Sequence, residues 1–262
     1  MKKNALGGDF VTLLSVPIER LSKEDIAYRI EQALKQSDRC TKVYTPNPQI
    51  LLRAHRAPSL LALLKRADLL LPDGIGLCIG AHMLASPLPC RMAGIDAAYA
   101  VLETAEREGL SVALLGAAPG VAERAAENLR RKLPNLWICY THHGYFDRNG
   151  EENEAVLGAL RTAAPDILFV CFGFPEQEKW IDAHAHAIPS LRLCMGLGGS
   201  LDVWAGKRRR APRAMSVCGM EWLWRVMCEP RRARIFLDIP HFFYLVLRQK
   251  AQESKKAVAE SK

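Results

Sequence analysis

Short apolar runs alternate with longer segments in which apolar residues recur every three or four positions along residues 10–205. The short runs predict strands that are buried on both faces, and the longer segments predict amphipathic helices. The strands are expected at residues 10–16, 41–44, 69–71, 111–115, 136–140, 167–172 and 191–195. Strands and helices that alternate at this pitch are typical of an α/β fold with a Rossmann-like, doubly wound and mostly parallel sheet.

Two of the expected helices carry clear boundary signals. Ser22 precedes Glu24 and Asp25, a pattern typical of a helix N-terminus. Gly109 follows the helix that opens within residues 91–96, in the position that favours a left-handed residue. These signals place helices between the expected strands, as the doubly wound fold requires.

Asp73 directly follows the run of leucines and Pro72 at residues 69–72. Proline ends the strand because it has no N–H to donate, and Gly74 and Gly76 allow a tight turn. The carboxyl ends of parallel strands form the edge at which open α/β sheets bind ligands, so this carboxylate is a candidate for chemistry. The alternative is that Asp73 only caps the helix expected at residues 74–84.

Polar turns follow the expected strands at three further places. They contain Thr45 with Asn47, Glu176 with Gln177, and the glycine-rich residues 196–200. Because the carboxyl ends of parallel strands share one edge, these turns and Asp73 are expected to line one crevice. The backbone N–H groups of residues 196–200 are suited to binding a phosphate.

The basic character of the chain lies in its last fifth. Residues 206–262 contain 14 Lys and Arg against 5 Asp and Glu, whereas residues 1–205 contain 22 against 23. Apolar and aromatic residues are dense from 215 to 247, but no uninterrupted stretch reaches the roughly 20 residues that span a bilayer. We therefore expect an α/β domain that carries the site at residues 1–205, a basic amphipathic helical appendage at 206–250 and a disordered tail at 251–262.

A basic segment of this kind predicts an anionic partner, which is a membrane surface, a nucleic acid or a phosphate-bearing substrate. The aromatic residues of the appendage cluster with aliphatic ones. This pattern favours helices that lie on a membrane surface, and no nucleic-acid partner is expected. A basic-tailed nucleic-acid-binding protein stays the alternative, and it predicts binding to RNA or DNA that falls steeply with salt.

The compartment is predicted from two features. Residues 1–9 include two lysines but no apolar core, so no secretory signal is expected. The eight cysteines form no Cys-x-x-Cys pair, which favours free thiols in a reducing compartment. The chain is therefore expected in the cytoplasm.

Several cofactor signatures are absent from the sequence. Leu201 occupies the place of the last glycine of the dinucleotide fingerprint, which argues against a nicotinamide oxidoreductase. No Walker loop and no Asp-x-Asp pair occurs, and His184 and His186 would point to different faces of a helix. No cofactor and no metal is therefore expected, and arginines are expected to neutralise any phosphate charge.

Polar and glycine positions fall into a series of short motifs along the chain. They are Thr45-x-Asn47, Pro72-Asp73-Gly74-x-Gly76, Arg91-x-x-Gly94-x-Asp96, Gly173-x-Pro175-x-Gln177-Glu178, Gly196-x-Gly198, Arg210-Ala211-Pro212 and Glu221-Trp222-Leu223-x-Arg225. In this order, and with no block missing between residues 9 and 248, the series resembles the WecG/TagA/CpsF glycosyltransferase family.

The resemblance implies an inverting, metal-independent transferase bound peripherally to the inner face of the cell membrane. It implies a UDP-sugar donor, with N-acetylmannosamine or its uronate favoured, and an acceptor sugar linked to undecaprenyl diphosphate. Products of this kind are early intermediates of wall teichoic acid, enterobacterial common antigen or capsular and exopolysaccharides. A family member that uses a different UDP-hexose is an alternative, and the oligomeric state stays open.

The resemblance also implies roles for single residues. Asp73 would be the general base that takes a proton from the acceptor hydroxyl. Donor and acceptor would be bound by Thr45, Asn47, Arg91 and Gln177, beside Gly196 and Gly198 of the glycine-rich loop. The appendage would fold over the site and stabilise the departing diphosphate with Arg225, Arg232 and Arg234.

Overall fold

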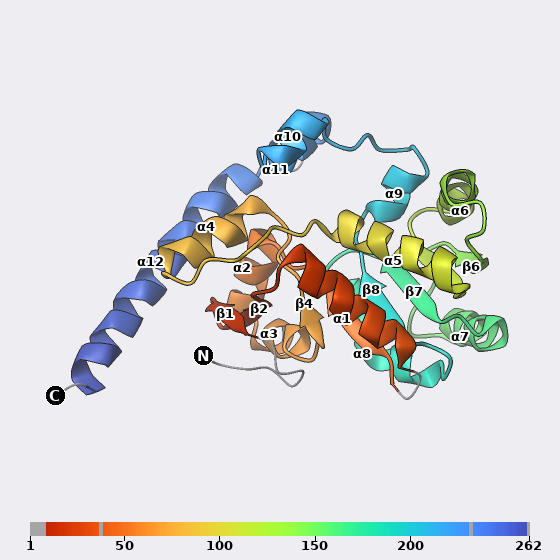
Figure 1. Ribbon diagram of the computed structural model, residues 1–262, viewed down its shortest axis with the longest axis horizontal. Helices are drawn as coiled ribbons and strands as arrows, with labels where there is room; N and C mark the ends of the chain where they lie inside the picture. The colour runs from red at the N-terminus through yellow and green to blue at the C-terminus, as the bar shows by residue number, and fades with distance from the viewer. Residues whose placement is uncertain (1–8, 37–38, 231–232, 261–262) are drawn as a thin grey trace.

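A six-stranded sheet forms the centre of the computed structural model, which describes residues 9–36, 39–230 and 233–260 (Figure 1). The strand order is β4-β3-β8-β7-β5-β6, and every neighbouring pair is parallel. The strands are β3 (Thr41–Tyr44), β4 (Leu69–Leu70), β5 (Val112–Gly116), β6 (Ile138–His142), β7 (Ile167–Cys171) and β8 (Leu193–Gly196). This sheet confirms the predicted Rossmann-like α/β class.

Helices cover both faces of the sheet, and each face has its own apolar core (Figure 1). The first face carries α1 (Lys23–Lys35), α5 (Gly94–Glu108), α6 (Val121–Lys132) and α9 (Ser200–Trp204). The second face carries α2 (Pro48–Arg56), α3 (Pro58–Leu64), α4 (Ile75–Met83), α7 (Glu151–Ala163), α8 (Glu176–His184) and the 3-10 helix η1 (Ala185–Ala187). Every residue of β5 and β7 is buried, which explains why these strands are continuous apolar runs in the sequence.

The predicted boundaries of two helices are confirmed. The Ser22 hydroxyl accepts the Asp25 N–H at 3.0 Å, and the Asp25 carboxylate accepts the Ser22 N–H at 3.2 Å, so the two residues form a capping box at the start of α1. Gly109 ends α5 in the left-handed region, with a φ of 66°.

The first expected strand is wrong in detail. Residues 10–16 contribute to a hairpin of β1 (Phe10–Leu13) and β2 (Val16–Glu19), which forms a separate antiparallel sheet. The turn residues Leu14 and Ser15 have positive φ angles of 48° and 71°. Glycine and asparagine are the usual residues at such positions, so the sequence carries no turn signal here.

Helices in the described part of the chain after residue 206 include α10 (Arg213–Val217), α11 (Glu221–Cys228) and α12 (Ile235–Glu260). Residues 251–260, which the sequence places in a disordered tail, continue α12. None of the helices in the described part of the chain combines the length and the hydropathy that a membrane crossing requires.

The middle of α12 is fixed to the α/β core, where it lies along α2 and α4 (Figure 1). Phe242 and Val246 are fully buried in the core of the second sheet face. Gln249 binds the β1–β2 hairpin: its Oε1 accepts the Leu14 N–H at 2.9 Å and its Nε2 donates to the Thr12 carbonyl at 2.8 Å. The C-terminal fifth therefore has two parts, an anchored α12 and the α10–α11 pair.

Candidate active site

Asp73 lies in a turn that backbone hydrogen bonds join to two other segments. Its N–H donates to the Pro46 carbonyl at 3.0 Å, and the Pro72 carbonyl accepts the Met92 N–H at 2.9 Å. The turn follows β4 at the carboxyl edge of the sheet. Three segments therefore meet at this edge; the turns after β3 and β4 were expected there from their strand ends, whereas the segment before α5 was not.

The structure contradicts the alternative that Asp73 only caps a helix. Helix α4 begins at Ile75, its N-cap residue is Gly74, and no side chain caps it. Among the described residues, Asp73 also takes part in no direct ion pair. Its carboxylate therefore neither caps α4 nor forms a direct ion pair with a described residue.

Thr45 lies against Gly94, the first residue of α5. A Cβ atom at Gly94 would be 2.7 Å from Thr45 Oγ1, so this contact requires glycine. The Gly94 N–H also acts on Asp73 and lowers the pKa of its carboxyl. Asn47 lies two residues beyond Thr45, and its Oδ1 accepts the Ile50 N–H at 3.1 Å as the cap of α2. The structure thus brings Thr45 and Asp73 together and places Asn47 next to them.

Burial raises the pKa of the Asp73 carboxyl to about 6. The guanidinium groups of Arg225 and Arg91 lower this pKa, whereas the neighbouring Glu221 carboxylate raises it. A carboxyl group with this pKa is ionised at neutral pH and is a stronger base than an ordinary aspartate. Since Glu221 and Arg225 belong to α11, the appendage supplies two of the charges around Asp73.

The turn between α10 and α11 lies against the start of α4. Gly219 in this turn has a φ of 71°, and a Cβ atom there would be 2.7 Å from the Ile75 Cβ. Arg91 joins the same turn to the core: its Nη2 donates to the Ser216 carbonyl at 3.0 Å, and its Nη1 pairs with Glu221 Oε2 at 3.4 Å. The appendage therefore docks directly beside the Asp73 turn.

The three predicted appendage arginines have different outcomes. Arg225 is exposed and close enough to Asp73 to lower the pKa of its carboxyl. Arg234 is also exposed; its carbonyl accepts the Asp238 N–H at 3.1 Å, and no ion pair joins its side chain to a described residue. Arg232 lies outside the described residues. Of the described pair, then, Arg225 is the arginine that the structure brings to Asp73.

Gln177 holds two loops together at the carboxyl edge. Its Oε1 accepts the Gly173 N–H at 3.1 Å and the Gly198 N–H at 2.8 Å, and its Nε2 donates to Glu178 Oε1 at 2.9 Å. The side chain is only 4% exposed. Gln177 thus shapes the edge after β7 and β8, and its role in binding substrate stays a prediction.

The glycine-rich loop after β8 differs from the predicted phosphate cradle. The Leu197 N–H donates to a carbonyl of β7 at 2.9 Å, and the Ser200 N–H donates to the Leu197 carbonyl at 3.2 Å. The Gly198 N–H is bound by Gln177, and a Cβ at Gly196 would be 2.8 Å from Gln177 Nε2. Three N–H groups of the loop therefore already donate hydrogen bonds within the protein. The prediction that these groups bind a phosphate is wrong. Substrate contact by Gly196 and Gly198 stays a prediction.

Two acidic residues near the site were not predicted as site residues. Glu221 interrupts an apolar segment four positions before Arg225, and this spacing is the sequence signal that could have found it. Glu178 follows Gln177; burial raises its pKa to about 7, and its Oε2 has no hydrogen-bond partner among the described residues. No comparable spacing signal marks Glu178.

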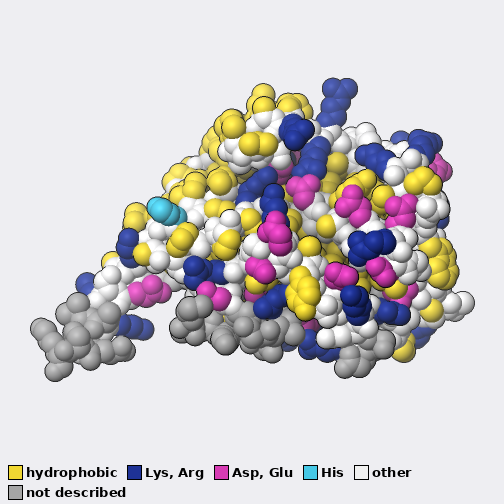
Figure 2. Space-filling model, viewed as in Figure 1, with side chains coloured by type: hydrophobic (Ala, Val, Ile, Leu, Met, Phe, Trp, Pro, Cys, Tyr) yellow, Lys and Arg dark blue, Asp and Glu magenta, His cyan; other side chains and the backbone are white. Residues whose placement is uncertain are grey.

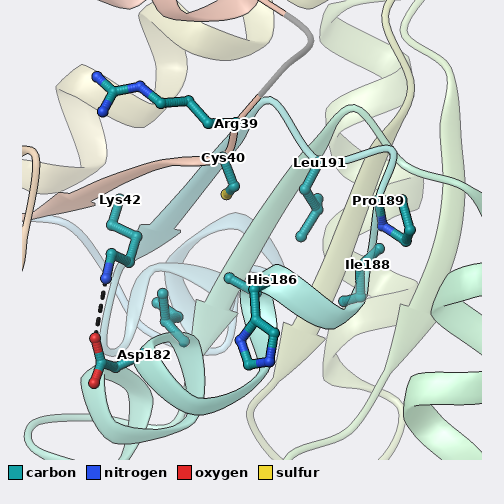
Figure 3. Close-up of a pocket in the computed structure, with 10 residues that line it drawn as sticks. Arg39, Cys40, Lys42, Asp182, His186, Ile188, Pro189 and Leu191 are labelled. Atoms are coloured by element: carbon teal, nitrogen blue, oxygen red, sulfur yellow. Dashed lines mark hydrogen bonds and ion pairs between the residues drawn. The ribbon is translucent and has the colours of Figure 1, made fainter.

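A separate hollow of about 340 Å³ lies at the opposite, amino edge of β3 (Figure 3). Cys40 and Lys42 reach it from the start of β3, and Asp182 and His186 reach it from α8 and η1. Lys42 Nζ and Asp182 Oδ1 form an ion pair at 3.0 Å within it. Because it opens at the amino edge, this hollow is not part of the Asp73 site.

No three His, Cys, Asp or Glu side chains of the described ranges form a group that could hold a metal ion. All eight cysteines are free thiols. The positive charges that act on Asp73 within the described structure belong to Arg91 and Arg225. Arg225 carries the larger of the two effects on the Asp73 pKa.

Exposed apolar side chains gather over α10, α11 and the adjoining part of α12 (Figure 2). Val217, Met227 and Leu237 are 78%, 64% and 75% exposed. Arg213 of α10 and Arg225 of α11 are exposed as well. This surface combines apolar and cationic side chains, and we call it the appendage face.

Comparisons with known proteins cover both the core and the appendage. The sequence model described as "Glycosyl transferase WecG/TagA/CpsF family" matches residues 11–256. The N-acetylglucosaminyldiphosphoundecaprenol N-acetyl-beta-D-mannosaminyltransferase of Bacillus spizizenii is 33% identical over 213 residues, which are 81% of each chain. The protein of the same name from Staphylococcus aureus strain MRSA252 is 35% identical over 213 residues, which are 81% of this chain and 82% of the relative.

Proposed function

The chain belongs to the WecG/TagA/CpsF family and is a glycosyltransferase, and we propose that it moves N-acetylmannosamine, or its uronate, from UDP to a lipid-linked acceptor. The acceptor in this proposal is N-acetylglucosamine on undecaprenyl diphosphate, which both relatives carry in their names. The product would serve the synthesis of a cell-surface polysaccharide such as a wall teichoic acid.

One observation carries the proposal: a partly buried carboxylate, Asp73, lies at the carboxyl edge of the sheet within the electrostatic reach of two arginines from distant segments. Asp73 would take the proton of the acceptor hydroxyl as the hydroxyl oxygen attacks the anomeric carbon of the donor. Because the pKa of Asp73 is about 6, the carboxylate is ionised near neutral pH and still accepts a proton well. Attack opposite the departing UDP inverts the anomeric centre.

The departing diphosphate needs positive charge. Arg225 would supply it, together with Arg232 and Arg234, because a guanidinium fork binds two phosphate oxygens at once. Stabilisation by arginines would let the transfer proceed without a divalent metal. Thr45 and Asn47, next to Asp73, would orient the sugars, and Gln177 would hold the loops that contain Gly196 and Gly198.

The appendage face is proposed to lie on the anionic inner surface of the cell membrane. Its exposed apolar side chains would enter the interface, and each arginine near the surface would add about 1 kcal/mol. This orientation brings the Asp73 edge, which α11 borders, close to the lipid that carries the acceptor.

A donor panel tests the proposal. Purified full-length protein is mixed with a short-chain N-acetylglucosaminyl-diphospholipid and, in turn, with UDP-N-acetylmannosamine, its uronate, UDP-N-acetylglucosamine and UDP-glucose. Acceptor-dependent UDP release with one of the mannosamine donors is expected, and it should persist in excess EDTA. Release with UDP-glucose alone would show that the donor is a different UDP-hexose. Loss of activity in EDTA would contradict the arginine mechanism.

Co-sedimentation tests the membrane part of the proposal. The protein is expected to sediment with vesicles that contain anionic lipid and to bind neutral vesicles more weakly. Met227→Asp and Leu237→Asp should lower the bound fraction, since both side chains are exposed on the appendage face. Tight, salt-sensitive binding to RNA without vesicle binding would favour the nucleic-acid alternative instead.

A further inference from the structure

Glu221 is a buried acid at the start of α11, and it has three partners. Its Oε2 pairs with Arg91 Nη1 at 3.4 Å, and its Oε1 pairs with Arg210 Nη2 at 3.7 Å. The Ser216 hydroxyl donates to the same Oε1. Only 10% of the Glu221 side chain is exposed, so these partners rather than water compensate its charge.

The contacts of Glu221 belong to a chain of alternating charges that begins and ends on the core. Arg210 Nη2 also pairs with Asp96 Oδ1 at 2.6 Å. Asp96 lies in the first turn of α5, and Arg91 lies in the segment just before that helix. Glu221 and Arg210 come from the appendage. Glu221 is therefore the central acid of the junction between the two parts of the molecule.

This junction joins the start of α11 to the core beside Asp73. Arg225 is four positions after Glu221, so both side chains lie on one face of the helix. The Arg91 guanidinium is directed to Glu221 and to the Ser216 carbonyl, and it makes no direct ion pair with Asp73. A direct Asp73–Arg91 pair would weaken the base, because an adjacent cation stabilises the ionised carboxylate.

We propose that Glu221 is a positioning residue for Asp73: it holds the Arg91 guanidinium away from the Asp73 carboxylate. The inference rests on the proposed function, in which Asp73 is the base. The charged groups that face Asp73 are Glu221 and Arg225 from α11 and Arg91 from the segment before α5. Loss of the Glu221 charge removes the acid that raises the pKa of Asp73, and it frees Arg91 to lower that pKa.

The ionisation of Asp73 tests this role without relying on catalysis. Full-length protein labelled with ¹³C at the aspartate carboxyls is titrated by NMR, and Asp73→Asn assigns the Asp73 signal. In Glu221→Gln, Asp73 is expected to titrate at a lower pH than in the wild type. Glu229→Gln is the matched control, since Glu229 follows the other end of α11 and pairs there with Arg208 at 3.0 Å. In Glu229→Gln, Asp73 should titrate at the same pH as in the wild type.

Transfer kinetics give a second readout. The acid limb of the kcat/KM profile is expected to move to lower pH in Glu221→Gln, because the base stays ionised further into the acid range. A lower kcat with an unmoved acid limb and an unchanged Asp73 titration would mean a merely structural role and would overturn the inference.

A second variant covers the case in which Glu221→Gln does not fold. Arg91→Met breaks the same pair from the core side and removes a cation that lowers the pKa of Asp73. Asp73 should then titrate at a higher pH than in the wild type, and an unchanged titration would overturn the inference.

The two readouts also separate this inference from the proposed function. If Asp73 titrates lower in Glu221→Gln but the wild type transfers no sugar, the coupling between Glu221 and Asp73 stands and the proposed function fails. If the wild type transfers sugar and Asp73 titrates alike in both proteins, the proposed function stands and the role of Glu221 fails.

Discussion

The two halves of the candidate site are held in different ways. In the core, the Asp73 N–H donates to the Pro46 carbonyl, and Thr45 lies directly on the backbone of Gly94. In the appendage, α10 and α11 contact the core through charged side chains such as Arg91, besides the packing of Gly219 on Ile75. Backbone contacts survive most side-chain substitutions, whereas each charged contact is lost with either partner. The core half is therefore built into the sheet, and the appendage half depends on docking.

The same contrast divides the C-terminal helices. Phe242 and Val246 of α12 are fully buried, whereas Val217 of α10 and Met227 of α11 are mostly exposed. Helix α12 is thus part of the core, although it belongs to the basic last fifth of the sequence. Truncation after residue 205 would remove core side chains together with the arginines, so point substitutions are the cleaner probes.

The largest effect is expected where α12 enters the core. Phe242→Ala should lower the free energy of unfolding by about 3–5 kcal/mol, because it leaves a cavity that the surroundings fill only in part. Phe236→Ala, six positions earlier on the same helix, is the control and should change stability by less than about 1 kcal/mol, since Phe236 is 49% exposed. Urea unfolding followed by circular dichroism measures both. Equal losses would mean that α12 is not anchored through Phe242.

The second-largest effect is expected in the appendage half of the site. Arg225→Gln should lower kcat by about 10²–10³-fold, because a donor to the developing diphosphate charge is lost. Its unfolding midpoint should hardly change, since the side chain is exposed. Arg213→Gln removes an exposed arginine from α10 and is the matched control. Assays with a short-chain acceptor in detergent remove the contribution of membrane binding, and equal rates for the two variants would contradict the role of Arg225.

The smallest effect is a gain in stability from the loss of Asp73. Burial holds the pKa of Asp73 at about 6, above its ordinary value of 3.8. The protonated form therefore stabilises the fold below about pH 4, and this stabilisation is lost as the pH rises through 6. Asp73→Asn cannot ionise, so it should be more stable than the wild type by about 1–2 kcal/mol at pH 8, allowing for partial exposure, and no more stable at pH 4. Unfolding midpoints that differ equally at both pH values would contradict the raised pKa.

Much of the fold follows from the sequence because the sheet is buried on both faces. Continuous apolar runs mark the strands, and a capping signal at Ser22 marks the start of α1. The β1–β2 hairpin could not be predicted, because Leu14 and Ser15 adopt positive φ angles without the residues that usually signal them. Such a turn is imposed by the packing around it.

The core half of the site is predictable, and the junction is not. Thr45 and Asp73 follow strands, and strand ends share one edge in a parallel sheet, so their proximity could be predicted. The pairing of Arg91 with Glu221 joins residues 130 positions apart through side chains, and no spacing rule describes it. The loop after β8 shows the same limit, since its Gly198 N–H is bound by Gln177, which stands 21 positions earlier in the chain.

The central claim is that Asp73 is the base of a site that α11 completes. The most direct measurement compares transfer by the wild type and Asp73→Asn from pH 5 to 9, at saturating donor and short-chain acceptor. The wild-type rate should rise through a pKa of about 6 to a plateau, and the variant should be about 10²–10⁴-fold slower, without that acid limb. Near wild-type turnover by Asp73→Asn, with the same acid limb, would contradict the claim.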